Sequence, residues 1–319
     1  MMKKIVKRSL FVVLCLVVVG VVVSLYVGNY VYDYTINPHS AHSIFEMLDI
    51  DEEKFEEANV WLNEHGINVK RHSFDDLTLH SYYVDQGSDV TVLLVHGYRS
   101  EGSSVIHPIK RFYKEGYNLL IPDLRGHGKS DGDYIGMGLD DRKDIMMWID
   151  YLIERNHNTI ILYGISMGGA TLLNLSAEKL PLQVKCIISD CAYSSIIELL
   201  KYHLDLNDMK NKIALNLASY MTYIRAGYHI EDVVPLSKVK YSKIPILFIH
   251  GEKDEFIPVS MAYDLYNATR CEKSLLILSE GKHAHNFKYS DIYYEYVFQF
   301  INSYIKYNED MDEFTKIYQ

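Results

Sequence analysis

The chain has few cysteines, no surplus of basic residues, and no internal repeat or low-complexity linker. Four cysteines in 319 residues, one of them within the apolar N-terminal run, form neither a disulfide framework nor a set with metal-ligand spacing. The formal net charge of -10 leaves no basic stripe that could bind nucleic acid. A hydrophobic content of 48% excludes disorder over most of the chain. The sequence therefore predicts one large globular domain without a nucleic-acid partner.

The N-terminus carries a long apolar run. Residues 10–27 contain no charged side chain, and as a helix they would be about 27 Å long, against about 30 Å for the hydrocarbon core of a bilayer. Four basic residues precede the run: Lys3, Lys4, Lys7 and Arg8. We therefore expect residues 1–28 to be a single-pass anchor in the cell membrane. Because the positive charges lie before the span, the rest of the chain is expected outside the cytoplasm. A cleaved signal peptide and a secreted protein are the alternative, although the run is longer than a usual signal core.

Beyond the anchor, short apolar runs alternate with amphipathic stretches. The apolar runs predict buried strands at 77–84, 90–95, 117–122, 159–163, 184–189, 244–250 and 274–278. The amphipathic stretches predict helices at 49–62, 105–113, 140–155 and 170–180. This alternation is typical of an α/β fold with a mostly parallel central sheet covered by helices on both faces. In such folds the functional sites lie at the carboxyl ends of the strands.

These patterns divide the chain into four regions. We assign 1–28 to the anchor, 29–68 to a connector and N-terminal helix, 69–307 to the α/β domain and 308–319 to a polar tail. Residues 194–240 break the alternation, because they contain amphipathic stretches and no strand between two core strands. We predict that this insertion is a helical lid over the functional site.

A serine stands between one predicted strand and the next predicted helix. The sequence Gly-Ile-Ser-Met-Gly at 164–168 directly follows the apolar run 159–163. A sharp strand-to-helix turn strains its central residue and needs glycine two positions to either side, so that strand and helix can approach closely. The pattern is that of a nucleophile elbow, and it makes Ser166 the candidate nucleophile.

A nucleophilic serine needs an imidazole to take its proton and a carboxylate to orient that imidazole. In this architecture the acid and then the base follow the serine, each in a loop beyond a core strand. Asp254 and His283 lie just beyond the last two predicted strands, so we assign Asp254 as the acid and His283 as the base. Asp190, at the end of the strand before, is the rival acid, and His285 is the rival base.

The oxyanion that forms during acyl transfer needs two fixed hydrogen-bond donors. The backbone N–H of Met167 is one candidate, because it stands at the N-terminus of the predicted helix, where the dipole favours negative charge. The backbone N–H of Tyr98, in the loop after the strand at 90–95, is the other.

Five motifs in a fixed order resemble those of the α/β-hydrolase superfamily over roughly residues 75–304. They are Leu-Val-His-Gly-Tyr at 94–98, Asp-Leu-Arg-Gly-His-Gly-Lys-Ser at 123–130, Gly-Ile-Ser-Met-Gly-Gly at 164–169, Gly-Glu-Lys-Asp at 251–254 and Lys-His-Ala at 282–284. The sequence is most similar to bacterial membrane-anchored or secreted hydrolases of the serine aminopeptidase S33-like or esterase-like type. The resemblance implies Ser166 as nucleophile, Asp254 as acid, His283 as base, and Tyr98 and Met167 as oxyanion donors. It also implies that the loop at 125–128 shapes the fold near the site.

The sequence thus predicts a serine hydrolase that cleaves a small-molecule carboxylic ester through an acyl-enzyme on Ser166, with no metal or organic cofactor. An aminopeptidase-like amide hydrolase or an acyltransferase would use the same residues. An aminopeptidase also needs a carboxylate near the site for the substrate's α-ammonium group, and Glu198, Asp205 and Asp208 of the lid are the candidates. The alternative from another class is a non-catalytic surface protein that keeps the scaffold for binding.

Overall fold

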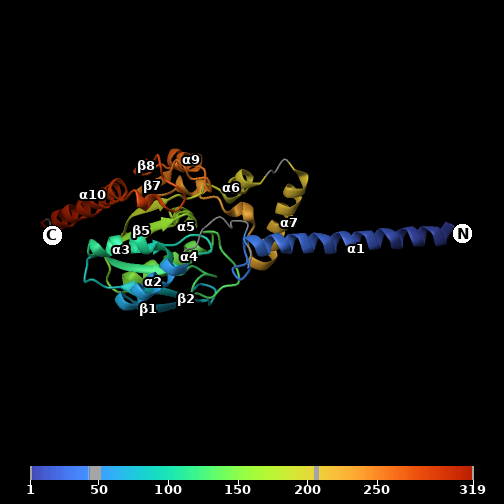
Figure 1. The fold of residues 1–319 in the computed structure, drawn as a ribbon, viewed down its shortest axis with the longest axis horizontal. Helices are drawn as coiled ribbons and strands as arrows, with labels where there is room; N and C mark the ends of the chain where they lie inside the picture. The colour runs from blue at the N-terminus through green and yellow to red at the C-terminus, as the bar shows by residue number, and fades with distance from the viewer. Residues whose placement is uncertain (1, 42, 44–51, 205–207, 318–319) are drawn as a thin grey trace.

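The protein forms one eight-stranded sheet with helices on both faces and a long helix projecting from one end (Figure 1). The structure, a computed structural model, describes residues 2–41, 43, 52–204 and 208–317. The mostly parallel α/β architecture expected from the sequence is confirmed.

The sheet has the order β1-β2-β4-β3-β5-β6-β7-β8. Its strands are β1 (Ile67–His72), β2 (Thr78–Val84), β3 (Val90–Val95), β4 (Asn118–Pro122), β5 (Thr159–Ile165), β6 (Val184–Asp190), β7 (Ile246–Gly251) and β8 (Lys273–Leu278). The pairs β1–β2 and β2–β4 are antiparallel, and all the other pairs are parallel. The register pairs Val95 with Gly164, Ile165 with Asp190, and Gly251 with Leu278. The loops after β3, β5, β6, β7 and β8 therefore leave the sheet at the same edge.

Two hydrophobic layers lie on either side of the sheet. One layer packs β-strand side chains such as Ile161 and Tyr163 against α2 (Glu52–His65), α3 (Ile106–Lys114) and α10 (Ser290–Ile317). The other layer packs Leu162 and Ile187 against α4 (Asp141–Glu154), α5 (Met167–Leu175) and α9 (Ser260–Ala268). Both faces of the central strands are thus buried, which explains why their sequences read as continuous apolar runs.

The insertion at 194–240 contains no strand among its described residues. It consists of α6 (Ile196–His203), α7 (Met209–Ala226), a 3-10 turn η2 (Ile230–Asp232) and the short α8 (Leu236–Val239). Asp208 caps α7 by accepting a hydrogen bond from Lys210 N, and Gly227 ends it with a left-handed backbone. The candidate acidic residue Asp205 lies outside the described residues.

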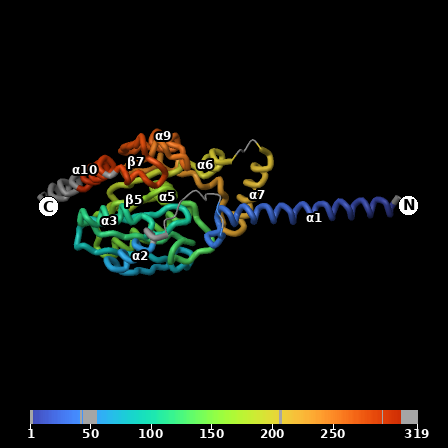
Figure 2. Tube along the Cα trace, viewed as in Figure 1, coloured from blue at the N-terminus to red at the C-terminus, as the bar shows by residue number. Residues whose placement is uncertain are grey.

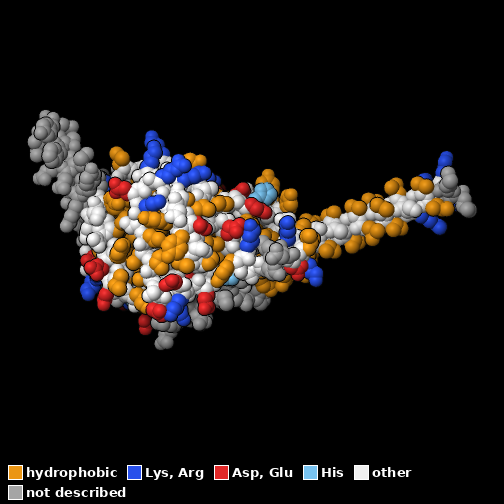
Figure 3. Space-filling model, turned by 90° about the horizontal axis from the view of Figure 1, so that it is seen from above, with side chains coloured by type: hydrophobic (Ala, Val, Ile, Leu, Met, Phe, Trp, Pro, Cys, Tyr) orange, Lys and Arg blue, Asp and Glu red, His pale blue; other side chains and the backbone are white. Residues whose placement is uncertain are grey.

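The N-terminal helix α1 (Met2–Thr35) is the projecting element, and it is long and apolar enough to cross a membrane. None of its most apolar window is buried, and Figure 3 shows hydrophobic side chains along its length. Its last turns differ from the predicted anchor, because the helix continues past residue 28 and enters the domain. Tyr32 and Ile36 are 1% exposed and belong to the main core. The N-terminus and the C-terminal helix α10 lie at opposite ends of the molecule (Figure 2).

Most element boundaries fall within three residues of those predicted. The helix expected at 170–180 is instead α5, which begins directly after Ser166 and ends at Leu175. The start of the helix expected at 49–62 lies outside the described residues, which begin again at Glu52. The polar segment after residue 307 continues α10 as far as Ile317 and does not form a separate tail. One edge strand, β1, was not predicted at all.

Candidate active site

The turn between β5 and α5 has the geometry that the elbow pattern predicts. Ser166 has φ 56° and ψ -119°, a strained conformation for a residue with a side chain. A Cβ atom on Gly164 would lie 2.5 Å from the carbonyl carbon of Gly168, and one on Gly168 would lie 2.2 Å from the carbonyl oxygen of Val95. Only glycine therefore fits at these two positions, and their absence of side chains lets α5 pack directly against the ends of β3 and β5.

Ser166, His283 and Asp254 form a continuous hydrogen-bonded chain. Ser166 Oγ lies 3.0 Å from His283 Nε2, and His283 Nδ1 lies 2.8 Å from Asp254 Oδ2. All three residues are less than 10% exposed. Since the carboxylate accepts the proton on Nδ1, the neutral imidazole leaves Nε2 free to accept the proton of the serine hydroxyl. The order of the contacts is that expected for a nucleophile, a base and an orienting acid.

Asp254 is held by donors on both carboxylate oxygens. Its Oδ1 accepts hydrogen bonds from the backbone N–H groups of Phe256 and Ile257, at 2.9 and 2.8 Å. His250 Nε2 lies 3.3 Å from Oδ2. Burial acts to raise the pKa of Asp254, but the hydrogen bonds from His250 and His283 outweigh it and hold this pKa well below the usual range. The carboxylate is therefore ionised at neutral pH and can keep His283 in the required tautomer.

His250 is a residue of this site to which the sequence reasoning assigned no role. It is fully buried near the end of β7, and its Nε2 also lies 2.8 Å from the backbone carbonyl oxygen of Ile257. One N–H group is thus shared between the acid and the loop that carries it. Its position at the carboxyl end of a core strand, four residues before Asp254, was the available signal.

The structure does not bring the rival acid into contact with the base. Asp190 Oδ1 accepts a hydrogen bond from Asn286 Nδ2 at 2.7 Å, and its Oδ2 accepts one from the Tyr293 hydroxyl at 2.8 Å. Burial raises the pKa of Asp190. Its backbone carbonyl accepts a hydrogen bond from Ser166 N at 2.8 Å. Asp190 therefore braces the elbow and the loop after β8, and it does not orient His283.

The rival base is also turned away from the serine. His285 Nδ1 lies 2.8 Å from the backbone carbonyl oxygen of His283, so this ring donates to the loop that carries the base. The contact steadies the turn in which Ala284 has a left-handed backbone with φ 51°.

The two oxyanion candidates flank the serine. Met167 is the first residue of α5, so its N–H has no acceptor within the helix and lies at the positive end of the dipole. Tyr98 lies one residue after Gly97, whose Cβ position would be 3.5 Å from Ser166 Cβ. The Tyr98 phenol donates a hydrogen bond to the carbonyl oxygen of Thr35 at 2.8 Å, at the end of α1. The loop after β3 is thus held between the elbow and the projecting helix.

A small apolar cavity opens at Ser166. Its lining comes from the elbow, the loop after β3 and the start of the lid, and consists of Tyr98, Met137, Ser166, Met167, Tyr193, Ile196, Leu199, Phe256 and Ile257. Among the residues that the structure describes, no carboxylate or ammonium group lines this cavity. The lining therefore suits an apolar part of a substrate next to the serine hydroxyl.

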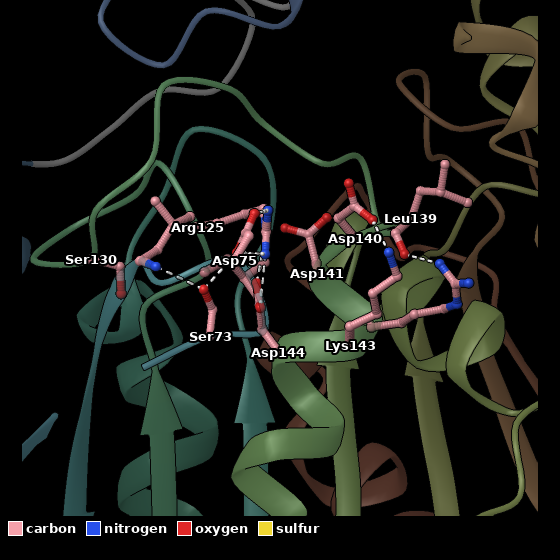
Figure 4. A network of polar contacts seen from close by, with 12 residues as sticks. Ser73, Asp75, Arg125, Ser130, Leu139, Asp140, Asp141, Lys143 and Asp144 are labelled. Carbon is pink, nitrogen blue, oxygen red and sulfur yellow. Dashed lines mark hydrogen bonds and ion pairs between the residues drawn. The ribbon is translucent and has the colours of Figure 1, made fainter. Parts of the chain in front are cut away.

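The loop at 123–130 is built around a buried arginine (Figure 4). Arg125 is fully buried and donates two hydrogen bonds to Asp144, at 2.7 and 2.9 Å, and two to Asp75, at 2.9 and 3.2 Å. Burial acts to lower the pKa of Arg125, but the bonds to Asp144 and Asp75 outweigh it and raise this pKa. The arginine joins the β1–β2 turn to α4, which is a structural role near the site, as the family resemblance implied.

Three potential metal ligands lie together in the part of the chain that the structure describes. The ligand atoms of Cys191, Asp254 and His283 lie within 4.8 Å of one another. Burial raises the pKa of Cys191 well above its usual value, and the nearby carboxylates act in the same direction. The thiol is therefore protonated and is a poor metal ligand. Since the other two residues are hydrogen-bonded to each other, this group does not fit a metal centre.

Comparisons with known proteins agree with this architecture. The family model described as serine aminopeptidase, S33, matches residues 86–218. The uncharacterised protein YqkD of Bacillus subtilis is 30% identical over 197 residues, which are 61% of this chain and 65% of that protein. A thermostable monoacylglycerol lipase from a Bacillus species is 24% identical over 226 residues, covering 65% of this chain and 88% of the lipase.

Solved structures show the same fold. An esterase from Pyrococcus furiosus superposes with a TM-score of 0.62 at 22% identity, covering 77% of this chain and 93% of the esterase. An esterase from Exiguobacterium antarcticum superposes with a TM-score of 0.56 at 16% identity, covering 74% of this chain and all of the esterase. At these identities the likeness shows the fold alone. Taken with the family match and the sequence relatives, it shows that the chain has the α/β-hydrolase fold and is similar to proteins of the α/β-hydrolase superfamily.

Proposed function

We propose that the protein is a serine hydrolase that cleaves carboxylic esters through an acyl-enzyme on Ser166. The observation that carries this proposal is the hydrogen-bonded chain from Ser166 Oγ through His283 to Asp254, with the serine in a strained turn at the carboxyl edge of the sheet. The chemistry requires a hydroxyl that a substrate can reach, a base in contact with it and a fixed acid behind the base, and the cavity at Ser166 together with this hydrogen-bonded chain supports all three.

In the first half of the reaction, His283 Nε2 takes the proton of the Ser166 hydroxyl while Oγ bonds to the ester carbonyl carbon. The carbonyl π electrons move to oxygen, and the N–H groups of Met167 and Tyr98 stabilise that oxyanion. The tetrahedral intermediate then collapses, the bond to the alcohol oxygen breaks, and His283 gives its proton to the leaving alkoxide. Asp254 stays ionised and stabilises the imidazolium form of His283.

In the second half, a water molecule attacks the acyl-enzyme carbonyl while His283 takes one of its protons. Collapse of the second intermediate returns a proton to Ser166 Oγ and releases the carboxylic acid. Each donor on the oxyanion is worth about 3–4 kcal/mol of transition-state stabilisation in mutational tests on other enzymes. An alcohol or amine in place of water would give acyl transfer on the same residues.

The residues that line the cavity at Ser166 favour an ester substrate over an aminoacyl substrate. An α-ammonium group needs a carboxylate, and the described cavity lining is apolar. Of the lid carboxylates, Glu198 is paired with Lys201 at 2.6 Å and exposed, while Asp208 caps α7. Neither of these two described residues lines the cavity, so neither is a partner there for an N-terminal ammonium group.

We also propose that α1 is an uncleaved membrane anchor and that the catalytic domain lies outside the cytoplasm. The support is the length and composition of the helix, the four basic residues before its apolar run, and the burial of its last turn in the domain core. Protease accessibility of the domain in intact cells and in inverted vesicles tests the side of the membrane.

The core proposal is tested by labelling the full-length protein in detergent with a fluorophosphonate and locating the modified residue. We expect one adduct, on Ser166, and no adduct in Ser166→Ala. Hydrolysis of p-nitrophenyl esters of increasing chain length is compared with that of aminoacyl p-nitroanilides, with alcohol acceptors added to detect transfer. Undiminished esterase activity in Ser166→Ala would show that another group is the nucleophile.

A further inference from the structure

The lid helix α7 has two apolar faces, of which the domain covers only one. The buried face consists of Leu215, Ala218, Ser219, Thr222 and Ala226. The opposite face carries five large exposed residues: Met209, Ile213, Tyr220, Tyr223 and Ile224. Their side chains are between 51% and 68% exposed. At 100° per residue these five positions fall within one sector of the helix, which also contains the exposed Asn216. We call these five residues the α7 stripe.

The rings of both tyrosines of the α7 stripe contact the imidazole of His229. The ring of Tyr223 stacks on His229 with centroids 4.6 Å apart, and the ring of Tyr220 meets the same imidazole edge-on at 5.8 Å. Large aromatic side chains that are ordered yet more than half exposed are unusual on a water-facing helix. They suggest a surface that is covered in the functioning protein.

The middle of α7 crosses the membrane helix close to the point where that helix leaves the domain. A Cβ atom on Gly28 of α1 would lie 2.7 Å from the carbonyl oxygen of Leu217, so the two helices touch backbone to backbone at that point. Arg225 of α7 donates to Asn29 Oδ1 at 2.8 Å and pairs with Asp33. Figure 1 shows α7 crossing α1 at the base of its projecting part.

The position of this contact determines where α7 would lie relative to the surface of a bilayer. The apolar run of α1 ends at Val27, one residue before Gly28, and the polar Asn29 follows, so a bilayer that surrounds the run has its boundary at this crossing. An interfacial helix buries its apolar side chains about 5–10 Å into the headgroup region, and tyrosine is enriched there. Lys210 and Lys212, both exposed on α7, supply the basic residues that such helices carry towards lipid headgroups.

We propose that the α7 stripe rests on the bilayer that holds α1, so that the lid is a second, interfacial membrane contact. The occupant of this surface is lipid. The argument is continuity, because α7, which carries the exposed stripe, crosses the membrane helix at Gly28 and Leu217, directly after the apolar run of α1. A second copy of the chain seated on the stripe is the competing occupant.

The lid contact has a consequence for the substrate, which rests on the proposed function. A second apolar cavity lies at the end of α1 and is lined by Thr35, Ile36, Met137, Ile196, Leu200, Tyr228, Ile230 and Val233. It shares Met137 and Ile196 with the cavity at Ser166. The two small cavities are thus neighbours, and apolar side chains line both of them. With the lid on the bilayer, the substrate class that we infer is an ester of a long acyl chain drawn from the bilayer, for which the two cavities would have to widen into one.

The membrane contact is tested by fluorescence in the full-length protein, reconstituted into lipid nanodiscs. Single cysteines replace Ile213, Tyr220 and Ile224 in turn, in a background with Cys15→Ala and Cys271→Ala, and carry an environment-sensitive fluorophore. Leu182→Cys, at a residue that is 90% exposed between α5 and β6, is the matched control, and Val17→Cys reports insertion of α1. Lipids with a nitroxide near the headgroup serve as the quencher.

We expect the three α7 labels to be quenched at least about twofold more than the label at position 182. If only the label at position 17 is quenched, α1 is inserted and the α7 stripe lies in water, which overturns the proposal. Energy transfer between labels at position 220 of two copies, without lipid quenching, would assign the stripe to a self-contact and also overturn it.

The substrate consequence is tested separately. The triple variant Ile213→Ser, Tyr220→Ser, Ile224→Ser should hydrolyse a long-chain ester in vesicles at least about tenfold more slowly, with hydrolysis of a short soluble ester unchanged. Leu182→Ser should alter neither rate. Equal loss on both esters would refute the consequence. Ser166→Ala should abolish hydrolysis and keep the quenching at α7, so a failure of the proposed function and a failure of the membrane contact give different results.

Discussion

Replacing Asp254 by asparagine separates the orienting role of the acid from its place in the fold. The amide of Asp254→Asn is nearly the same shape as the carboxylate, and its oxygen can still accept the N–H groups of Phe256 and Ile257. The amide NH2 group then takes the place of Oδ2, which lies 2.8 Å from His283 Nδ1 in the native protein. A donor at that point favours the imidazole tautomer that carries its proton on Nε2.

That tautomer cannot do the chemistry, because an Nε2 that already bears a proton does not accept one from Ser166. The same exchange in a serine protease lowers kcat by about 10⁴ with the geometry intact, which corresponds to about 5 kcal/mol of activation free energy. We expect a loss of this size for Asp254→Asn, together with a rate that rises towards high pH, where hydroxide can replace the base. The amide NH2 cannot accept the hydrogen bond that Oδ2 accepts from His250, so some folding stability is lost as well, and kcat is compared at a temperature at which both proteins are folded.

Asp190→Asn is the matched control. Asp190 is equally buried, and because burial raises its pKa whereas the pKa of Asp254 is lowered, a neutral amide is easier to accommodate at position 190. The amide NH2 can donate to the Tyr293 oxygen, whose hydroxyl can turn to Tyr163. We expect kcat/KM for p-nitrophenyl butyrate to stay within about tenfold of the native value. The reasoning is refuted if Asp190→Asn loses as much activity as Asp254→Asn, or if Asp254→Asn keeps most of its activity while remaining folded.

Three further changes test the framework around the site. Gly168→Ala should destabilise the fold by at least about 3 kcal/mol because its Cβ would overlap backbone atoms, whereas the melting temperature of Gly97→Ala should barely change, since its Cβ meets only ordinary contacts. Arg125→Met leaves Asp144 buried and unpaired, so chemical denaturation in detergent should show a loss of about 3–5 kcal/mol, and a loss below 1 kcal/mol would contradict the role of the ion pair. Burial raises the pKa of Asp141 to about 7, so its folded form binds more protons than the unfolded chain between about pH 4 and 7. Stability should therefore fall as pH rises through that window, by up to about 4 kcal/mol, and Asp141→Asn should remove this slope.

The sequence predicted the central strands and the order of the site residues because both leave local signals. A strand buried on both faces reads as an uninterrupted apolar run, and the loops that follow such strands must meet at one edge of a parallel sheet. Ser166, Asp254 and His283 each follow a run of this kind. The edge strand β1 gave no such signal, since its sequence Ile-Asn-Val-Lys-Arg-His is mostly exposed and pairs with β2 alone.

The sequence alone could not distinguish the acid Asp254 from its rival Asp190. The reason differs from that for β1. Asp190 ends a core strand and Asp254 lies in the loop just after the next one, and what distinguishes them is the set of partners supplied by distant elements. Asn286 and Tyr293, about a hundred residues further along, engage Asp190, and they leave Asp254 as the carboxylate that faces His283. Such pairings depend on how α10 packs on the sheet, which no local pattern encodes.

The contact between the end of the anchor helix and the loop beside Ser166 could not be predicted from the sequence. A composition boundary at residue 28 suggested an anchor joined to the domain by a separate connector. In the structure, the carbonyl of Thr35 instead accepts the hydrogen bond of the Tyr98 phenol, and Arg99 donates to the carbonyls of Asn37 and Ser40. The chain just past the membrane span thus holds the loop that carries the proposed oxyanion donor. Because these contacts use backbone carbonyls, they depend on the position of α1 and not on its side chains. A shift in the position of α1 would therefore also shift the loop beside Ser166.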